Sequence, residues 1–239
     1  MLNIRKGRLF LIPVPLGPVP ADIVLPSAVQ NRAKSLTHFI AENAKSARAF
    51  LKSLPSDTPL QQIEICELNE HTSHTMLPDL LTPLHAGSDV GLISEAGCPA
   101  VADPGASLVA LAHLSGIPVY PMIGPSSILL ALMGSGLSGQ NFAFHGYLPK
   151  NGEQLQKTIL ELEQDSRRGK RTQIFIETPY RNRQMLEALI KNCAADTKIC
   201  VATDLTLHTE CITTRTQAEW RKQGIPNLER RPSVFLIQA

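Results

Sequence analysis

Ten residues, VGLISEAGCP at positions 90–99, decide the fold class of this sequence. Their first half, Val90–Ser94, is a short apolar run of the kind that forms a buried strand. In their second half, Gly97 allows the backbone to approach a ligand closely and Pro99 fixes a turn. A buried strand that opens into such a loop is typical of open α/β sheets, in which ligands bind beyond the carboxyl ends of the strands.

The same alternation continues on both sides of this stretch, where short apolar runs are followed by longer amphipathic ones. This pattern predicts a sheet of mostly parallel strands flanked by helices, and hence an α/β fold. In the first half of the sequence we expect strands at Leu9–Val14, Leu36–Ala41, Gln62–Leu68, Val90–Ser94 and Ile117–Pro121. The helices expected between them are Leu25–Ala33, Lys45–Leu54, Met76–His85 and Ser107–Leu114.

The pattern changes beyond the glycine- and serine-rich stretch Gly134–Gly139. Several short strands there follow one another without a helix between them, which indicates a mixed sheet. We therefore expect two α/β domains, at residues 1–122 and 123–239. The second has expected helices at Ile128–Met133, Glu153–Asp165, Asn182–Asn192 and Gln217–Lys222, and expected strands at Phe142–Tyr147, Gln173–Glu177, Lys198–Ala202, Glu210–Thr213 and Val234–Gln238.

The composition is that of an ordered protein, with 239 residues, 43% of them hydrophobic, and a net charge of +2. These values exclude collagen-like, disordered and coiled-coil chains. No window reaches about 18 consecutive apolar residues, and residues 1–10 lack the apolar stretch of a signal peptide, so we expect a cytoplasmic protein. The five cysteines form no C-x-x-C pair, which favours reduced thiols over disulfides or a zinc ribbon.

Two short motifs match ligand-binding patterns in their letters alone. Gly134–Gly139 spells G-x-G-x-x-G, but it follows an expected helix and precedes a strand, the reverse of the context of a dinucleotide-binding turn. His71 and His74 have H-x-x-H spacing, but no third ligand lies at a diagnostic spacing. We therefore expect neither a Rossmann dinucleotide site nor a bound metal.

Four loops rich in glycine and proline lie where strands are expected to end, which is where ligands of α/β sheets bind. Taken alone, each loop is also consistent with a tight connection that binds nothing. The four loops are Pro13–Pro18, Ser94–Gly105, Gly124–Ser127 and Glu177–Arg181.

Taken together and in order, these loops resemble the tetrapyrrole (corrin/porphyrin) methylase superfamily of S-adenosylmethionine-dependent methyltransferases. They are most similar to the branch of the 16S ribosomal RNA cytidine 2′-O-ribose methyltransferases. The resemblance runs from Leu9 to about Ile237. The matching segments are Ala41–Asn43, Glu70–His71, Leu92–Gly105, Ile123–Leu137, Phe144–Pro149 and Phe175–Arg181.

Some positions depart from the pattern of this branch. Glu95 and Asn43 stand where the branch has aspartate, and Thr72-Ser73 where it has Asn-Glu. Val14–Val19 replaces Thr-Pro-Ile-Gly-Asn-Leu, and Thr203–Leu207 replaces Arg-Glu-Leu-Thr-Lys. Since the sequence ends at Ala239, we also expect the small further C-terminal module of many rRNA-acting members to be absent. These differences concern the acceptor more than the methyl donor.

The resemblance implies two α/β domains with S-adenosylmethionine folded in the cleft between them, and a homodimer. It assigns cofactor-binding roles to residues of both domains. They are Pro15, Leu16 and Gly17, which also border the acceptor side, together with Ser94, Glu95, Ala96, Gly97, Pro99, Ser126, Ser127, Tyr147, Leu148, Thr178 and Pro179.

Methyl transfer is an in-line displacement at a sulfonium carbon, so the enzyme must above all hold donor and acceptor in line. A ribose hydroxyl has a high pKa and needs a base or an orienting group beside it. Our candidates for that catalytic role are Glu70, His71 and Glu42, each of which is also explained as a surface or loop-capping residue.

RNA, and in particular a ribose 2′-hydroxyl of ribosomal RNA, is the leading acceptor hypothesis. The basic run Arg167–Arg171 is able to bind phosphates, or it is only the positively charged end of a helix. A net charge of +2 and 5% aromatic residues are low for a dedicated RNA-binding protein. Two alternatives stay open: methylation of a tetrapyrrole or other small molecule, and a non-catalytic homologue that binds the cofactor.

Overall fold

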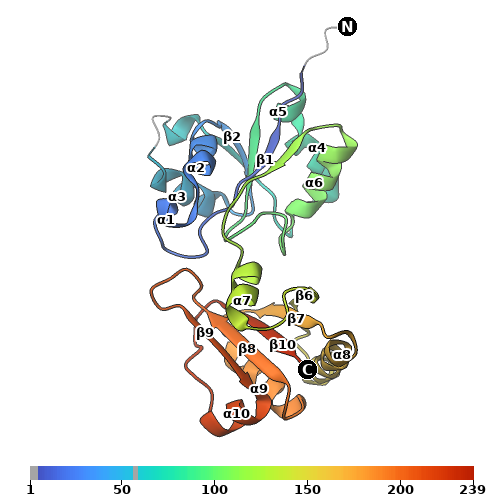
Figure 1. Ribbon diagram of the computed structural model, residues 1–239. Helices are drawn as coiled ribbons and strands as arrows, with labels where there is room; N and C mark the ends of the chain where they lie inside the picture. Colours follow the sequence, from blue (N-terminus) through green and yellow to red (C-terminus); the bar gives the residue numbers. More distant parts are fainter. Residues whose placement is uncertain (1–4, 56–58) are drawn as a thin grey trace. The chain divides into compact units, whose positions relative to one another are not determined.

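The computed structural model describes residues 5–55 and 59–239, and for His74 the backbone alone. The chain divides into two compact units, Met1–Ser126 and Ser127–Ala239 (Figure 1). We call them unit 1 and unit 2 and describe each by itself. The sequence-based domain boundary between residues 122 and 123 stays a prediction.

Unit 1 is built on a five-stranded sheet with the order β3-β2-β4-β1-β5. Every neighbouring pair is parallel, which confirms the expected parallel first sheet. The strands are β1 (Leu9–Leu11), β2 (His38–Ala41), β3 (Glu64–Glu67), β4 (Val90–Ile93) and β5 (Val119–Pro121).

Successive residues of these strands enter two separate cores, one on each face of the sheet. Phe10 and Phe39 pack on one face, while Leu9 and Ile40 pack on the other. Helices cover both faces (Figure 1). The first face carries α1 (Ala21–Val24), α2 (Ser27–Lys34), α3 (Ala44–Ser53) and the 3₁₀ turn η1 (Leu60–Gln62). The second carries α4 (Leu77–Leu80), α5 (Thr82–His85) and α6 (Gly105–Leu114), and the 3₁₀ turn η2 (His74–Met76) precedes α4.

The neighbouring strands β1 and β4 send the chain in opposite directions. The loop after β1 leads to α1 on the first face, whereas the loop after β4 leads to α6 on the second. In open α/β sheets, ligands bind at the carboxyl ends of two neighbouring strands whose chains continue to opposite faces in this way. The topology of unit 1 thus points to the same loops as the sequence.

Two helix predictions in unit 1 were wrong in detail. The single helix expected at Met76–His85 is two short helices, α4 and α5, with Leu81 between them. Pro78 and Pro83 each stand in the first turn of one of these helices, because proline lacks the N–H that a helix interior requires. The helix expected from Leu25 starts only at Ser27, after the separate turn α1.

Unit 2 is built on a mixed five-stranded sheet with the order β6-β7-β10-β8-β9. Strands β6 and β7 are parallel, and the other three pairs are antiparallel, as expected for the second sheet. The strands are β6 (Phe142–Tyr147), β7 (Thr172–Glu177), β8 (Lys198–Thr203), β9 (Cys211–Thr216) and β10 (Ser233–Gln238).

The two faces of this sheet are covered unequally. On one face Phe175 and Phe235 stack with ring centroids 5.9 Å apart, beneath α8 (Gly152–Gly169), α9 (Asn182–Asn192) and α10 (Gln217–Gln223). The single helix α7 (Ser127–Ser135) packs on the opposite face, where the Thr214 hydroxyl donates to the Ser135 carbonyl over 2.7 Å (Figure 1). Within the described residues, no helix is long and apolar enough to cross a membrane.

Candidate functional site

The carboxyl ends of the five parallel strands form one edge of unit 1, and most of the predicted site residues follow them directly. Pro15–Gly17 come after β1, Glu42 after β2, Glu70 and His71 after β3, and Ser94–Pro99 after β4. Ser126 ends the segment that follows β5. The fold therefore brings these residues of unit 1 to a common edge.

Backbone hydrogen bonds join the loops after β1 and β4. The Val14 amide donates to the Gly97 carbonyl over 3.0 Å, and the Gly97 amide donates back to the Val14 carbonyl over 3.1 Å. Gly97 has a φ of 74°, in the left-handed region that favours glycine. A Cβ atom at Gly97 would lie 3.1 Å from Leu16 Cδ2. A larger residue at position 97 would therefore be strained and would displace the end of the Leu16 side chain.

The segment after β5 packs against the same two loops. A Cβ atom at Gly124 would lie only 2.3 Å from Pro13 Cβ, so glycine is required for this close approach. The Cys98 thiol donates to the Pro125 carbonyl at 3.4 Å. Three loops that are far apart in sequence thus form one joint, made mainly by backbone atoms and small residues.

The connection from β4 to α6 contains two residues in a costly backbone conformation. Ala100 and Ala102 have φ values of 64° and 62°, which non-glycine residues seldom adopt. Asp103 Oδ1 holds this segment by accepting the amides of Ala100 and Gly105, each over 2.8 Å. Burial raises the pKa of Asp103, although these two amide hydrogen bonds oppose the shift. Strained backbone of this kind is concentrated at functional sites.

Three other carboxylates at this edge act on Glu42. Burial is the main cause that raises the pKa of Glu42, followed by the negative charges of Glu95, Asp103 and Glu70. The backbone amide of Glu95 donates to the Glu42 carboxylate, and Ser46 Oγ donates to Glu95 Oε1 over 3.1 Å. A carboxylate whose pKa is raised toward neutrality is a better general base than an ordinary one. Of the three catalytic candidates, Glu42 is the one in such an environment.

The other two catalytic candidates are exposed. Glu70 Oε1 lies 3.6 Å from His71 Nε2, and both side chains are 85% exposed. Their loop is ordered by Asn69, whose Oδ1 accepts the His71 amide over 3.0 Å. Glu70 and His71 are thus presented to solvent at the carboxyl end of β3.

Asn43, one of the departures from the branch pattern, has a structural role. Its Oδ1 accepts the amides of Lys45 over 2.9 Å and Ser46 over 3.2 Å, so it caps the N-terminus of α3. Asparagine and aspartate are about equally good at this position of a helix. This substitution therefore keeps the cap of α3.

In unit 2 the remaining predicted residues lie at three places. Ser127 begins α7, Tyr147 ends β6 and is followed by Leu148, and Thr178-Pro179 follow β7. Because β6 and β7 are parallel, Tyr147 and Thr178 share one edge of the mixed sheet. The pairing of the two strands is irregular between Phe144 and Tyr147. Such an irregularity re-aims a side chain at the end of a strand.

The turn from β7 to α9 is fixed by a buried carboxylate. Glu177 Oε1 accepts the amide of Thr178 over 2.7 Å and its hydroxyl over 3.2 Å. Its other oxygen, Oε2, lies 3.5 Å from Arg181 Nη2. Asn182, which is fully buried, donates from Nδ2 to the Arg231 carbonyl over 2.6 Å and to Ser233 Oγ over 3.0 Å. The turn is thereby tied to the entry of β10.

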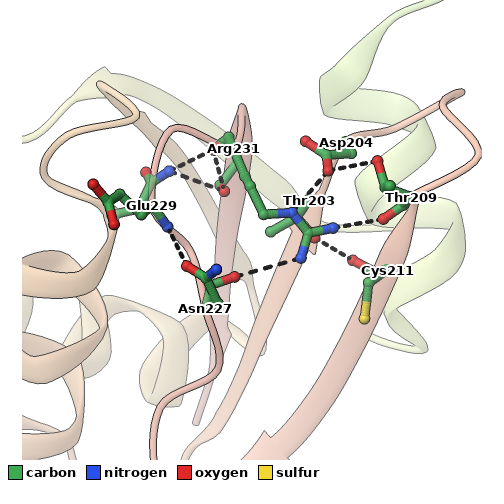
Figure 2. A network of polar contacts seen from close by, with 9 residues as sticks. Thr203, Asp204, Thr209, Cys211, Asn227, Glu229 and Arg231 are labelled. Carbon is green, nitrogen blue, oxygen red and sulfur yellow. Dashed lines mark hydrogen bonds and ion pairs between the residues drawn. The ribbon is translucent and has the colours of Figure 1, made fainter.

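A second network at the same edge is centred on Arg231 (Figure 2). Its guanidinium donates to Asp204 Oδ2 over 2.7 Å, to the Thr209 carbonyl over 2.5 Å and to the Asn227 carbonyl over 3.4 Å. Thr203 Oγ1 donates to the Cys211 carbonyl over 3.1 Å. The segment Thr203–Leu207, which differs from the pattern of the branch, thus belongs to a loop that Arg231 holds in place.

Sequence reasoning did not identify these polar anchors of unit 2. Four buried side-chain atoms in the described part of the chain have no hydrogen-bond partner, and all four lie in the turn after β7 or the loop after β8. Unpaired buried polar atoms are rare and often mark functional regions. The atoms are Glu177 Oε2, Arg181 Nη1, Asn182 Oδ1 and Thr206 Oγ1.

The basic run Arg167–Arg171 lies at the C-terminal end of α8 and just beyond it, where a helix dipole favours positive charge. Arg167 pairs with Asp196 over 3.2 Å, and Arg171 pairs with Asp165 over 3.2 Å. These two ion pairs involve two of the four positively charged side chains of the run. The helix-end interpretation is therefore favoured for Arg167 and Arg171.

The cysteine thiols of this chain are free, and those in the cores are held in the protonated form. Burial raises the pKa of Cys193 to about 12 and that of Cys200 to about 11. Among the described residues, no three histidine, cysteine, aspartate or glutamate side chains are grouped to hold a metal ion.

Comparison with curated proteins gives a consistent set of relatives. The chain is 32% identical over 201 residues to the ribosomal RNA small subunit methyltransferase I of Streptococcus pyogenes, covering 84% of this chain and 66% of that protein. It is 31% identical over 204 residues to the protein of the same name from Synechocystis, covering 85% and 69%. The protein of that name from Xylella fastidiosa is 29% identical over 231 residues, covering 97% and 80%. The chain thus spans slightly less than two thirds of the Streptococcus relatives' length.

Solved structures share the fold. The methyltransferase CobJ matches with a TM-score of 0.65 at 17% identity, covering 98% of this chain and 94% of that one. The uroporphyrin-III-C-methyltransferase of Thermus thermophilus matches with a TM-score of 0.55 at 14% identity, covering 97% and 92%. No protein-family model matches the sequence.

Proposed function

This chain belongs to the ribosomal RNA small subunit methyltransferase I family of the tetrapyrrole methylase superfamily, and on that premise we propose its activity. We propose that it transfers a methyl group from S-adenosylmethionine to a ribose 2′-hydroxyl of small-subunit ribosomal RNA. The activity named for the relatives is the first support for this proposal.

The single observation that carries the proposal is the joint between the loops after β1, β4 and β5. Reciprocal hydrogen bonds between Val14 and Gly97 close it, and Gly124 packs directly on Pro13. The backbone of the three joined loops lies at the carboxyl edge of the sheet, which is where α/β sheets bind ligands. A tight connection with no ligand would not require three separate loops to meet through glycine.

The residues of unit 1 also fit the charge of the proposed cofactor. When bound, S-adenosylmethionine supplies an electrophilic methyl group on a positively charged sulfur. The negative charges of Glu95 and Asp103 help to raise the pKa of Glu42, and these three carboxylates give the edge a negative potential. A negative edge favours a cationic ligand over a neutral one of the same shape. We propose as cofactor-binding residues those that the resemblance assigns. In unit 1 they are Pro15, Leu16, Gly17, Ser94, Glu95, Ala96, Gly97, Pro99 and Ser126, and in unit 2 they are Ser127, Tyr147, Leu148, Thr178 and Pro179.

The proposed catalytic groups act on the acceptor hydroxyl. Glu42, Glu70 and His71 follow β2 and β3 at the same edge. Glu42 is half-buried with a raised pKa, so it is suited to accept a proton from the hydroxyl. Glu70 and His71 are exposed and 3.6 Å apart, so they are suited to orient the hydroxyl. The homodimer and the placement of the cofactor between the two domains enter the proposal on the resemblance alone, and the cytoplasmic location enters it as the expectation from the sequence.

A labelled methyl transfer assay tests the proposal. The chain is incubated with S-adenosylmethionine labelled in the methyl group, together with either small ribosomal subunits or an extract of small metabolites. The proposal predicts label in ribosomal RNA, recovered after alkaline hydrolysis as an alkali-stable dinucleotide, because a 2′-O-methyl group blocks cleavage of the next phosphodiester. Label in the small-metabolite extract alone would instead support the tetrapyrrole or small-molecule alternative.

Cofactor binding without transfer to either acceptor would support the non-catalytic alternative. The matched control is the Glu42→Gln variant, in which the amide keeps the hydrogen bond from Glu95 but cannot accept a proton. It should transfer the label more slowly, by about 100-fold if Glu42 is the general base, and should bind the cofactor only slightly more weakly, because one negative charge of the edge is lost.

A further inference from the structure

Tyr180 is an exposed aromatic ring on a turn of unit 2 that is unusually well anchored. Tyr180 is 78% exposed. Aromatic residues make up only 5% of the sequence. Tyr180 occupies the turn between β7 and α9, three residues after Glu177. Within residues 5–55 and 59–239, its ring stacks on no other aromatic ring. A single exposed apolar residue is ordinary on a protein surface. What distinguishes Tyr180 is the fixed backbone of the turn that carries it.

The turn around Tyr180 is fixed from both sides. Before it, Thr178 donates twice to the buried Glu177 carboxylate, and the Arg181 amide donates to the Thr178 carbonyl over 2.9 Å. After it, Asn182 is fully buried and bonds to the entry of β10. Because the backbone on either side of Tyr180 is fixed, little conformational entropy of the turn is lost when a ligand packs on the ring.

The charges at this edge are compatible with a negatively charged ligand. The buried carboxylates of Glu177 and Asp204 face Arg181 and Arg231, so neither is left uncompensated. Unit 2 as a whole has 15 basic and 11 acidic residues, whereas unit 1 has 8 basic and 10 acidic residues. An anionic chain therefore meets less repulsion at unit 2 than at the acidic edge of unit 1.

From these observations we infer that Tyr180 is a stacking platform for an unpaired base of the RNA acceptor. Aromatic side chains bind single-stranded nucleic acid by stacking on the faces of bases, whereas the bases of a duplex are already stacked on one another. The inference rests on the RNA acceptor of the proposed function and adds how that acceptor is recognised. It assigns Tyr180 to RNA, while Tyr147 at the end of β6 stays with the cofactor.

Direct RNA binding tests the inference. Fluorescence anisotropy is measured for the full chain with a labelled single-stranded RNA of about 12 nucleotides, and with the duplex that this RNA forms with its complement. The wild type should prefer the single strand. Tyr180→Ala should weaken single-strand binding about tenfold, and Tyr180→Phe should bind like the wild type, because phenylalanine keeps the stacking face. The slope of affinity against salt concentration should be the same in all three, because stacking releases no counterions.

The matched control is Phe142→Ala. Phe142 is an exposed aromatic residue at the start of β6, at the opposite edge of the same sheet, so its loss should leave RNA binding unchanged. Calorimetry with S-adenosylmethionine completes the test, and Tyr180→Ala should bind the cofactor as the wild type does.

Wild-type affinity for RNA in Tyr180→Ala, or no binding of RNA by the wild type, would overturn the inference. So would a loss of cofactor affinity in Tyr180→Ala, since the ring would then belong to the cofactor site. If Tyr180-dependent RNA binding is found but no methyl transfer occurs, the proposed function fails while this inference stands.

Discussion

The two units build their functional edges in different ways. At the edge of unit 1, backbone hydrogen bonds between Val14 and Gly97 and the approach of Gly124 to Pro13 hold the loops together. At the edge of unit 2, buried side-chain pairs do this work, with Arg231 on Asp204 and Arg181 on Glu177. The first edge depends on the absence of side chains at a few positions, and the second depends on their presence.

This difference teaches which substitutions each edge tolerates. In unit 1 the carboxylates of Glu42 and Glu95 lie beside the joint and are not part of it, so their removal should change charge without changing shape. In unit 2 the charged side chains themselves hold the loops in place, so their removal should change the local structure. Four substitutions test the contrast, in decreasing order of expected effect.

Arg231→Ala should destabilise the protein most, by about 3 kcal/mol, because it leaves the buried Asp204 carboxylate without a positively charged partner and with the Thr209 hydroxyl as its remaining donor. Chemical denaturation measures this loss. Arg167→Ala is the matched control, since Arg167 pairs with Asp196 at the surface and its removal should cost far less stability than the removal of Arg231. Equal losses in the two variants would show that unit 2 is not held together by its buried pairs.

Gly97→Val should weaken the binding of S-adenosylmethionine by about 100-fold, because it places a branched side chain where the loop backbone is proposed to approach the cofactor. The matched control is Gly136→Val, since Gly136 also has a positive φ, of 68°, but no atom lies within 4 Å of an added Cβ. Both variants should lose stability through backbone strain of about 1–3 kcal/mol. Calorimetry should find reduced affinity only in Gly97→Val, and unchanged affinity in that variant would remove the joint from the cofactor site.

Ala100→Gly should stabilise the protein by about 0.5 kcal/mol. Ala100 has a φ of 64°, and glycine relieves the strain of that conformation at the cost of greater chain entropy in the unfolded state. Ala49→Gly, at an exposed position inside α3, should have the opposite effect and lose about 1 kcal/mol. Thermal unfolding of the pair measures the contrast, which disappears if the loop is not strained.

Glu42→Gln should have the smallest effect on stability, and one that depends on pH. Burial raises the pKa of Glu42 in the folded state, so the folded protein binds this proton more tightly than the unfolded chain, and stability falls as pH rises through that interval. At neutral pH the variant should be more stable by a few tenths of a kcal/mol, because solvent screens a half-exposed group. Below the ordinary pKa of glutamate the difference should vanish.

Asp196→Asn is the control of opposite sign for this titration. The Arg167 guanidinium lowers the pKa of Asp196, so the stability contributed by that carboxylate is present at neutral pH and is lost as pH falls. Denaturation across a pH series should therefore show the two variants diverging from the wild type in opposite directions. The same sign in both would contradict the environment described for Glu42.

The fold was predictable because its signals are local. Runs such as Val90–Ile93 are apolar throughout, as strands buried on both faces must be, and the change to a mixed sheet followed from strands with no helix between them. The errors are local too. Pro78 and Pro83 divide a stretch with helical periodicity, and the four-residue helix α1 is too short to give a periodic signal.

The candidate site was predictable only in part. Loops rich in glycine and proline identified the joint of unit 1, because the need for a small residue at a position is visible from the identity of that one residue. The anchors of unit 2 were not identifiable, since Asp204 and Arg231 lie 27 residues apart and each alone is an ordinary charged residue. Periodicity carries no information about such pairs, and neither does a short motif.

The most direct test of the account is a calorimetric titration of the wild-type chain with S-adenosylmethionine. If the jointed loops of unit 1 form the methyl-donor site, the titration should show saturable binding with a dissociation constant in the micromolar range. No heat and no thermal stabilisation at millimolar S-adenosylmethionine would contradict the account, whatever the similarity to methyltransferases.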